Sequence, residues 1–380
     1  MTKQSLYGLV ERLRILRKKQ NEIRKFQDAR RKDICRFGRL SNEQKKEVDC
    51  FYECNYGEKI PYTWHEHNKA VSGKFDVRFF PELLFIPEFE HFMNSNSAFV
   101  DVFQDKNMLH AVAGRAGVKM PESILECACG VHLSRGERRI SREQAIELVS
   151  DAGPAFLKPT KGTCSGNGCR VVDFADGFDL LSGERVDAVL SGVGRDYTLQ
   201  KRIKCHQAVS MLHPQSVNTF RVMTYQWKNE LIVAPVIMRI GQSGNFLDNA
   251  HAGGVFIGVD SSGTLLRKAM TEFNVVYTSH PDTGIVFEGY RIDGYEKVVA
   301  AAKEMHMVLP QIGIASWDFT LDDVGDPVLI EANLAGGSIW LIQMAHGRPF
   351  FGERTEEILQ WIRAMKKLKP EERYDHLFGW

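Results

Sequence analysis

Three polar residues in the last quarter of the chain could bind a metal ion. Glu331 and Asn333 are two residues apart in the expected strand 328–333, so their side chains point to one face. Asp318 lies in the expected strand before it, and Asp318 and Glu331 are equally far from the centre of the turn at 322–327. A regular hairpin would therefore place the two carboxylates opposite each other, where they repel unless a cation lies between them. Carboxylate and amide oxygens suit Mg²⁺, so the pattern predicts a magnesium site; the alternative is an ordinary polar hairpin end.

A glycine-rich loop follows Lys158. Short expected strands at 155–159 and 169–172 flank the loop TKGTCSGNG, residues 160–168. Glycines let backbone N–H groups approach phosphate oxygens closely. Walker and Rossmann loops are followed by a helix, whereas this loop joins two strands. The pattern therefore predicts a hairpin that covers a nucleotide. Its candidate binding residues are Lys158, Gly162, Ser165, Gly166 and Gly168.

Two arginines occupy expected strands in the second half of the chain. Arg221 lies within the strand 217–224, and Arg239 lies near the end of a single expected strand, 231–240. Two guanidinium groups in one sheet are costly unless they meet an anion. We therefore expect an anionic group beside them.

The elements that must position these residues alternate between strands and helices. A further strand is expected at 255–260, and a strand with a connector at 196–203. Expected helices are 6–27, one opening at 40–44, 108–116, one from Ser141 toward Gly153, 295–309 and 355–365. The aromatic-rich stretch 56–92 is expected to form a small α/β or irregular lobe, in which His65 has a structural role.

Composition excludes several classes of protein. The 380 residues are 43% hydrophobic and carry a formal net charge of +1, which is ordinary for a globular chain and does not indicate nucleic-acid binding. The longest apolar run, near 231–238, is too short to span a bilayer, and the first residues lack the apolar core of a secretion signal, so a cytoplasmic protein is expected. The 8 cysteines are expected to be free thiols; Cys127, Cys129 and His132 are only a weak metal pattern.

The helix expected at 6–27 is basic and amphipathic. Leu9, Leu13 and Leu16 recur at helical spacing among arginines and lysines. We expect this leucine stripe to pack on the domain and the basic side to be solvated. The alternative is that the helix docks on a partner or peripherally on the inner face of an anionic membrane.

The order of the candidate residues resembles that of the ATP-grasp superfamily. In sequence, the matching positions are Lys106, Lys158 with its glycine loop, a hinge at 200–203, Arg221, Arg239, Asp318 and the motif Glu331-Ala332-Asn333. The narrower resemblance is to the sugar-transfer-associated ATP-grasp family. It rests on residues 105–107, 216–221, 248–254, 280–284 and Gln343.

The resemblance implies an α+β ATP-grasp fold, in which two lobes hold ATP between them. It divides the chain into a basic helical extension (1–39), an N-terminal lobe (40–104), a small lobe with the glycine-rich lid (105–205) and a large lobe with the metal site (206–380). ATP and Mg²⁺ are the implied cofactors. Lys106 and Lys158 would contact phosphates, and Gln200, Lys201 and Ile203 would line the adenine site. Lys201 departs from the Gln-Glu of many hinges, and the ribose-binding acid has no clear candidate beyond His206.

The implied reaction is carboxylate activation. A small-molecule or glycan carboxylate would form an acyl phosphate that an amine or another nucleophile then attacks, in polysaccharide or glycoconjugate synthesis. Arg221 and Arg239 would stabilise the transferred phosphoryl group, and Asn218, Asn249 and His251 would line the acceptor side. Residues 62–92 and 242–254 are expected to shape the acceptor pocket. Two alternatives remain open: phosphoryl transfer to a sugar hydroxyl, and a non-catalytic nucleotide-binding partner of a membrane glycan assembly machine.

Overall fold

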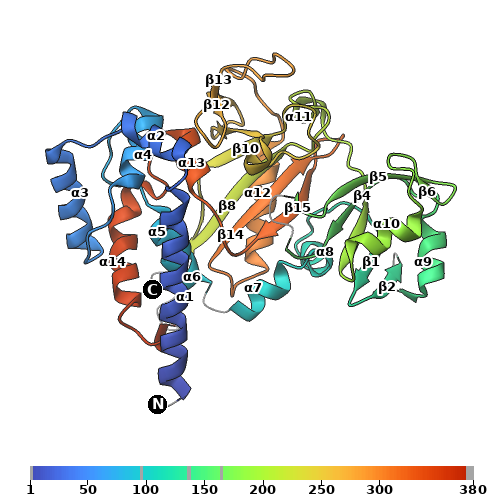
Figure 1. The fold of residues 1–380 in the computed structure, drawn as a ribbon, viewed down its shortest axis with the longest axis horizontal. Helices are drawn as coiled ribbons and strands as arrows, with labels where there is room; N and C mark the ends of the chain where they lie inside the picture. Colours follow the sequence, from blue (N-terminus) through green and yellow to red (C-terminus); the bar gives the residue numbers. More distant parts are fainter. Residues whose placement is uncertain (1–2, 95–96, 135–137, 163–165, 374–380) are drawn as a thin grey trace.

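Two antiparallel sheets form the two lobes of the protein. The computed structural model describes residues 3–94, 97–134, 138–162 and 166–373. The small lobe lies at one end of the molecule and the helices of both chain termini lie at the other, with the larger sheet between them (Figure 1). This is the mixed α and β architecture that the sequence predicted.

The small lobe is a seven-stranded sheet with its own core. The strand order is β3-β2-β1-β7-β4-β5-β6. The strands are β1 (Ser123–Ala128), β2 (Val131–Ser134), β3 (Arg138–Ile140), β4 (Gly153–Pro159), β5 (Arg170–Ala175), β6 (Phe178–Asp179) and β7 (Tyr197–Lys201). Helices α9 (Arg142–Val149) and α10 (Val186–Val193) contribute apolar side chains to the same core as Leu125, Leu157 and Leu199. Ser141 and Gln144 form a capping box that fixes the start of α9.

The large lobe contains an eight-stranded sheet with the order β13-β12-β11-β10-β8-β14-β15, and β9 pairs with β8. The strands are β8 (Thr219–Trp227), β9 (Glu230–Val233), β10 (Val236–Ile240), β11 (Val255–Val259), β12 (Leu265–Met270), β13 (Val276–Tyr277), β14 (Ile314–Leu321) and β15 (Pro327–Asn333). Strand β8 alternates between two cores: Phe220 and Val222 pack with α12 (Tyr295–Met307), whereas Met223 and Tyr225 pack with the terminal helices. Arg221 therefore lies on the face of the terminal helices.

The single strand expected at 231–240 is two strands. Both β9 and β10 pair with β8, and the break falls at Ala234 and Pro235. Proline has no N–H to donate to a neighbouring strand, which explains why the pairing is interrupted there.

A helical layer covers the second face of the large sheet. It contains α2 (Ala29–Phe37), α3 (Asn42–Asn55), α4 (Thr63–Ser72), α5 (Glu82–Leu84), the π-helical turn η1 (Phe85–Glu90), α6 (His91–Met93), α13 (Trp340–His346) and α14 (Thr355–Met365). The remaining helices are α7 (Ser97–Phe103), α8 (Lys106–Arg115) and α11 (Gln207–Ser210). Two 3₁₀ turns complete the helical elements: η3 (Ala250–Ala252) and η4 (Gly352–Arg354).

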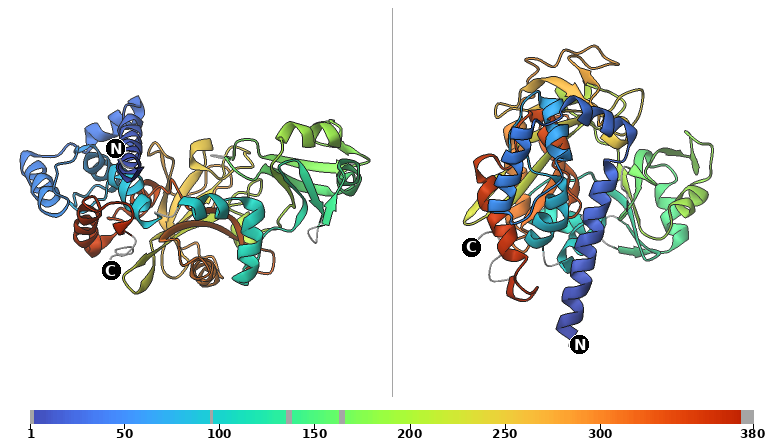
Figure 2. Two further views of the ribbon diagram at one scale, coloured as in Figure 1. Left: turned by 90° about the horizontal axis from the view of Figure 1, so that it is seen from below. Right: turned by 60° about the vertical axis from the view of Figure 1, so that its left-hand side comes forward.

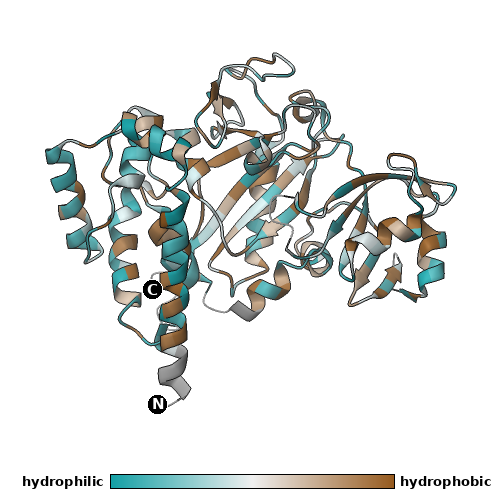
Figure 3. Ribbon diagram, viewed as in Figure 1, coloured by the Kyte–Doolittle hydropathy of each residue, from teal (hydrophilic) through white to brown (hydrophobic). Residues whose placement is uncertain are grey.

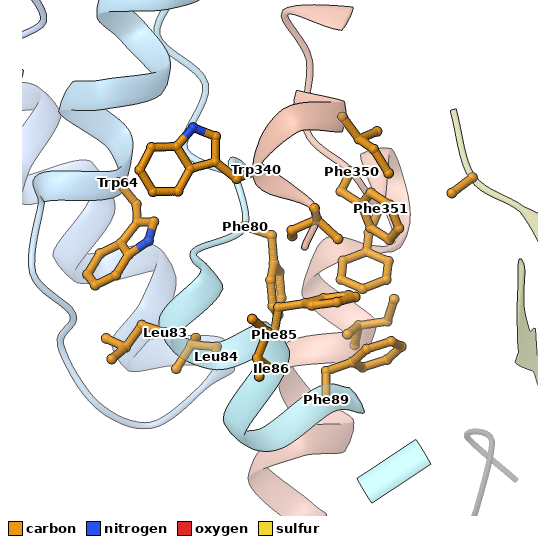
Figure 4. Close-up of a cluster of buried hydrophobic side chains, with 14 of the residues drawn as sticks. Trp64, Phe80, Leu83, Leu84, Phe85, Ile86, Phe89, Trp340, Phe350 and Phe351 are labelled. Atoms are coloured by element: carbon orange, nitrogen blue, oxygen red, sulfur yellow. The ribbon is translucent and has the colours of Figure 1, made fainter. Parts of the chain in front are cut away.

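The stretch 56–92, all of which the structure describes, consists of short helices joined by irregular segments and contains no strand, so of the expected α/β or irregular lobe the α/β alternative is wrong. Its aromatic residues are buried against the C-terminal helices: Phe85 and Phe89 contact Phe351, with ring centroids 6.1 and 4.8 Å apart. Figure 4 shows this cluster, in which side chains from both ends of the chain interdigitate. The buried aromatic residues of this stretch thus share one core with the C-terminal helices, and the predicted division of the chain into domains stays a prediction.

The first helix, α1 (Lys3–Lys25), packs by its polar side, the reverse of our expectation. Glu11 accepts hydrogen bonds from Arg373 (2.6 Å) and pairs with His91 (2.8 Å), and Lys19 pairs with buried Glu88 (2.6 Å). These ion pairs leave the leucine stripe in solvent. No helix in the described part of the chain is long and apolar enough to cross a membrane.

Candidate functional site

A cavity of about 640 Å³ lies where the two lobes meet. Most of the candidate residues line this cavity. From the small-lobe side these are Lys106, Lys158, Gly162, Gly166, Gln200, Lys201 and Ile203; from the large lobe they are Arg221, Arg239, Asn249, Asp318, Glu331 and Asn333. The fold therefore brings together residues that span more than two hundred positions of the sequence.

The hairpin β14–β15 places the predicted metal ligands side by side. Asp318 and Glu331 are paired, as predicted, but the hairpin is not regular, because the register shifts between Asp318 and Phe319, and Phe319 pairs with Leu329. Asn333 pairs with Ser316. Asn333 Nδ2 donates a hydrogen bond of 3.3 Å to Asp318 Oδ2. Two carboxylates and an amide therefore meet at one side of the cavity. No group of three or more His, Cys, Asp and Glu side chains within the described ranges is arranged to hold a metal, so the magnesium site stays a prediction.

The anion that meets the two arginines is Asp318 itself. Arg221 donates from Nε and Nη2 to its two carboxylate oxygens, at 2.9 and 2.8 Å, and Arg239 Nη2 lies 3.1 Å from Oδ2. Burial opposes ionisation of Asp318, but the two guanidinium groups outweigh it and hold its pKa below the usual range. The arginine pair is thereby fixed against the cavity wall.

Two lysines from α8 and β4 face this wall. Lys106 Nζ lies 3.0 Å from Glu331 Oε1. Lys158 is buried, and its Nζ donates a long hydrogen bond of 3.5 Å to the carbonyl of Ile330. Burial, and then the charge of Lys106, lower the pKa of Lys158 to about 8. Across the described residues, no carboxylate lies within ion-pair distance of Lys158, so the site fits a ligand that brings negative charge.

The glycine loop closes the cavity from the small lobe. Strands β4 and β5 pair around it, as predicted, with Leu157 opposite Arg170. Gly162 and Gly166 line the cavity in left-handed conformations, and a Cβ on Gly166 would come 2.6 Å from Leu247 Cδ1. The loop thus touches the loop of the large lobe that follows β10. Gly168 packs beside Pro159 and is not among the lining residues, and Ser165 lies outside the described residues.

The expected hinge at 200–203 also lines the cavity. Gln200 is buried, with Nε2 3.0 Å from His110 Nε2, and Lys201 pairs with Glu122 at 3.0 Å. These contacts occupy both side chains, which leaves backbone groups at this edge to bind a base. His206 caps α11, where its Nδ1 accepts from the amide of Ala208, and it does not line the cavity.

Two of the three residues expected on the acceptor side do not face the cavity. Asn218 is buried, and its side chain donates to the carbonyls of Val209 (2.8 Å) and His213 (3.2 Å). His251 pairs with Glu272 at 2.5 Å on the far side of η3. Asn249 accepts a hydrogen bond from the amide of His251, and of the three residues it is the one that lines the cavity.

The segment 62–92 is also absent from the cavity lining, because it forms the aromatic core. His65 has the structural role expected, since it is buried and its Nε2 lies 2.9 Å from the carbonyl of Val77. The segment 242–254 does contribute to the lining, through residues 246–249. Asp248 is one of the lining residues for which no role was predicted; it accepts a hydrogen bond from Thr219 and lies 3.5 Å from Arg239. Burial raises its pKa. The sequence signal for Asp248 was its position in the polar segment 248–254.

The two lobes, the paired lysines, the glycine hairpin and the Glu-x-Asn strand together define an ATP-grasp protein. More narrowly, the family model described as sugar-transfer associated ATP-grasp matches residues 85–358, so the chain belongs to this family. A search of curated proteins found no match.

Solved structures that resemble the chain are distant. The ADP complex of N5-carboxyaminoimidazole ribonucleotide synthetase (purK) is 15% identical with a TM-score of 0.37, over 62% of this chain and 45% of that one. VanG D-Ala:D-Ser ligase from Enterococcus faecalis is 16% identical with a TM-score of 0.40, over 69% and 62%. D-Alanine-D-alanine ligase from Helicobacter pylori is 15% identical with a TM-score of 0.38, over 68% and 58%. The chain thus spans about half the length of these proteins, and the family match carries the assignment.

Proposed function

We propose that the protein is an ATP- and Mg²⁺-dependent ligase that joins a carboxylate to an amine or another nucleophile through an acyl phosphate. Its substrates are proposed to belong to polysaccharide or glycoconjugate synthesis, in line with the description of the family. The observation that carries the proposal is Lys158: a buried cation with no carboxylate partner in the described chain, beside Lys106 in the cavity between the lobes. Such a cation fits the phosphates of a nucleotide.

The lysines would bind phosphate oxygens from the small-lobe side. Lys158 has no carboxylate to exchange among the described residues, whereas Lys106 would exchange Glu331 for phosphate, which releases Glu331 for metal binding. Asp318, Glu331 and Asn333 would hold Mg²⁺, which when bound supplies neutralisation of phosphate charge. Lys106 would thus pass from Glu331 to phosphate, and Glu331 from Lys106 to Mg²⁺. Each group keeps an oppositely charged partner throughout.

The arginines would act on the transferred group. Asp318 orients Arg221 and Arg239 before any ligand binds, so their remaining N–H groups need no reorganisation during the reaction. A substrate carboxylate oxygen attacks the γ-phosphorus, and the bond to ADP breaks. The nucleophile then attacks the acyl carbon, loses a proton and displaces inorganic phosphate. Asp248 is positioned near Arg239 to accept that proton.

Water exclusion would depend on the contact between the lobes. Gly166 of the small-lobe hairpin meets Leu247, and Leu247, Phe246 and Asn249 belong to the loop that also borders the cavity. An acyl phosphate is readily hydrolysed, so a closed hairpin protects it until the nucleophile arrives.

The test is ATP turnover with Mg²⁺ on panels of uronic acids and amino acids, with hydroxylamine as a trap. ADP with a hydroxamate supports the proposal and identifies the carboxylate substrate. ADP with a stable phosphorylated sugar and no hydroxamate would instead establish phosphoryl transfer to a hydroxyl. ATP binding without turnover on any panel would favour the non-catalytic alternative.

A further inference from the structure

The outward face of α1 is apolar at its centre and basic at its edges. Leu9, Leu13 and Leu16 are 46, 57 and 55% exposed, and Ile23 continues the stripe at 42%. Their spacing of four, three and seven residues keeps them on one side of the helix. Exposure of a leucine stripe to water is unfavourable in free energy, and such stripes are typical of surfaces that bind another protein or a membrane.

Charge is separated across this helix. The exposed charged residues from position 8 onward are all positive: Arg12, Arg14, Arg17, Arg24 and Lys25. The two acidic residues of the same stretch are less exposed: Glu11 binds Arg373, and buried Glu22 pairs with Lys25 at 2.7 Å, so four arginines carry the unpaired positive charge of this face among the described residues. The whole chain has a formal net charge of only +1, so the basic face of α1 is a local feature.

The position of the arginines distinguishes between the possible occupants. Arg12 lies on one side of the leucine stripe, and Arg17 and Arg24 lie on the other. A second copy of the chain on this stripe would bring like charges together along both edges. An anionic lipid surface instead accepts the leucines among its acyl chains and the arginines among its headgroups.

A basic cavity adjoins the same surface. Ile23, at the end of the stripe, borders a cavity of about 390 Å³ that Lys32, Arg36 and Arg39 also line, together with Glu66. Arg36 is paired with Asp33 at 2.7 Å. The positive surface thus continues from α1 onto α2, where phosphate groups of lipids could lie.

We infer that α1 docks the protein on a membrane surface that contains anionic lipids. The helix projects from the end of the molecule remote from the small lobe, as two views agree (Figures 1 and 2). Hydrophobic (brown) and hydrophilic (teal) residues alternate along the ribbon of α1 (Figure 3). Docking by α1 therefore leaves the cavity between the lobes accessible. The inference is independent of the proposed reaction.

The experiment is flotation of the full chain with vesicles of phosphatidylcholine alone or with added phosphatidylglycerol. We expect binding only to the anionic vesicles, weakened by salt. The variant Leu9→Ser, Leu13→Ser, Leu16→Ser should bind about tenfold or more weakly. The matched control is Leu180→Ser, Leu181→Ser in the small lobe, where both leucines are 63% exposed, and it should bind like the unaltered chain.

Three outcomes would overturn the inference. These are an absence of binding to anionic vesicles, equal binding by the leucine variant, and a dimer that the leucine variant abolishes in sedimentation equilibrium. The last would assign the stripe to a second copy. Thermal unfolding of each variant confirms that the fold is retained, and vesicle binding is scored without nucleotide, so a failure of the ligase proposal does not affect the result.

Discussion

Arg221 and Asp318 occupy paired positions on the adjacent strands β8 and β14, and the guanidinium group donates hydrogen bonds of 2.9 and 2.8 Å to the carboxylate. Asp318 is 1% exposed and also binds Arg239 at 3.1 Å. Asp318 is therefore shared by two guanidinium groups within the sheet that borders the cavity, and Asp248 lies 3.5 Å from the second of them.

Removal of this charge should destabilise the protein. In Asp318→Asn, Arg221 loses its carboxylate partner while it remains buried. We expect the free energy of unfolding to fall by about 3 kcal/mol, measured by chemical denaturation. A change below about 1 kcal/mol would show that Arg221 finds another partner or reaches water.

Glu331 should behave differently, because its side chain is 32% exposed and its partner Lys106 is beside an open cavity. In Glu331→Gln we expect Mg²⁺-dependent ATP turnover to be abolished, with little change in unfolding. The amide is a similar shape, but it is a poor ligand for Mg²⁺. Retained turnover would exclude Glu331 from the metal site.

Nucleotide binding should be coupled to a proton on Lys158. Burial and Lys106 lower the pKa of this residue to about 8, so in the free protein it is neutral above that pH. Bound phosphates favour the charged form, so ATP binding above pH 8 should take up a proton, and its apparent affinity should fall by up to about tenfold per pH unit. Calorimetry in buffers of different ionisation enthalpy measures this uptake.

The control for that experiment is Lys158→Arg, which stays charged throughout the range. ATP binding to this variant should take up no proton near pH 8, whatever the affinity of the variant for ATP. Uptake in both proteins would place the titrating group elsewhere.

The contact between Gly166 and Leu247 can be tested with a matched pair of glycines. Gly162 and Gly166 have φ values of +70 and +78°, so alanine at either costs a similar backbone strain of about 1 kcal/mol. A Cβ meets nothing within 4 Å at Gly162 but lies 2.6 Å from Leu247 at Gly166. We expect Gly166→Ala to reduce turnover more than Gly162→Ala, and added Leu247→Ala to remove the difference. Equal effects of the two alanines would show that closure does not depend on this contact.

The hairpin that carries the Glu-x-Asn motif was predictable from local sequence. Alternation and the turn between Asp318 and Glu331 are visible within twenty residues, and they predicted that these two residues face each other. The register shift between Asp318 and Phe319 was not predictable from them. The hairpin around the glycine loop was also predictable from local sequence.

Partners from distant strands were not predictable in this way. The rule that two arginines in a sheet need an anion was correct, but it could not identify Asp318, because the sequence does not say that β8 lies between β10 and β14. The same limit explains α1: its leucines suggested a packed face, whereas Glu88 and Arg373, which bind its polar side, are distant in sequence.

Roles assigned from a loop were the least predictable. Asn218 and His251 are polar residues near strand ends, a pattern typical of binding sites, yet backbone carbonyls and Glu272 engage them. Asn249 does line the cavity, but the partner that holds His251 elsewhere, Glu272, is 21 residues away in the sequence and could not be identified from the loop itself.

The aromatic cluster that joins η1 with Phe350 and Phe351 has a consequence for biosynthesis. The small-lobe core draws on residues between 125 and 199, so it can form on the ribosome as soon as that stretch has emerged. Phe85 and Phe89 emerge earlier but must wait for the last tenth of the chain. During translation these rings are exposed, and the nascent protein is expected to depend on chaperones until its final helices are released.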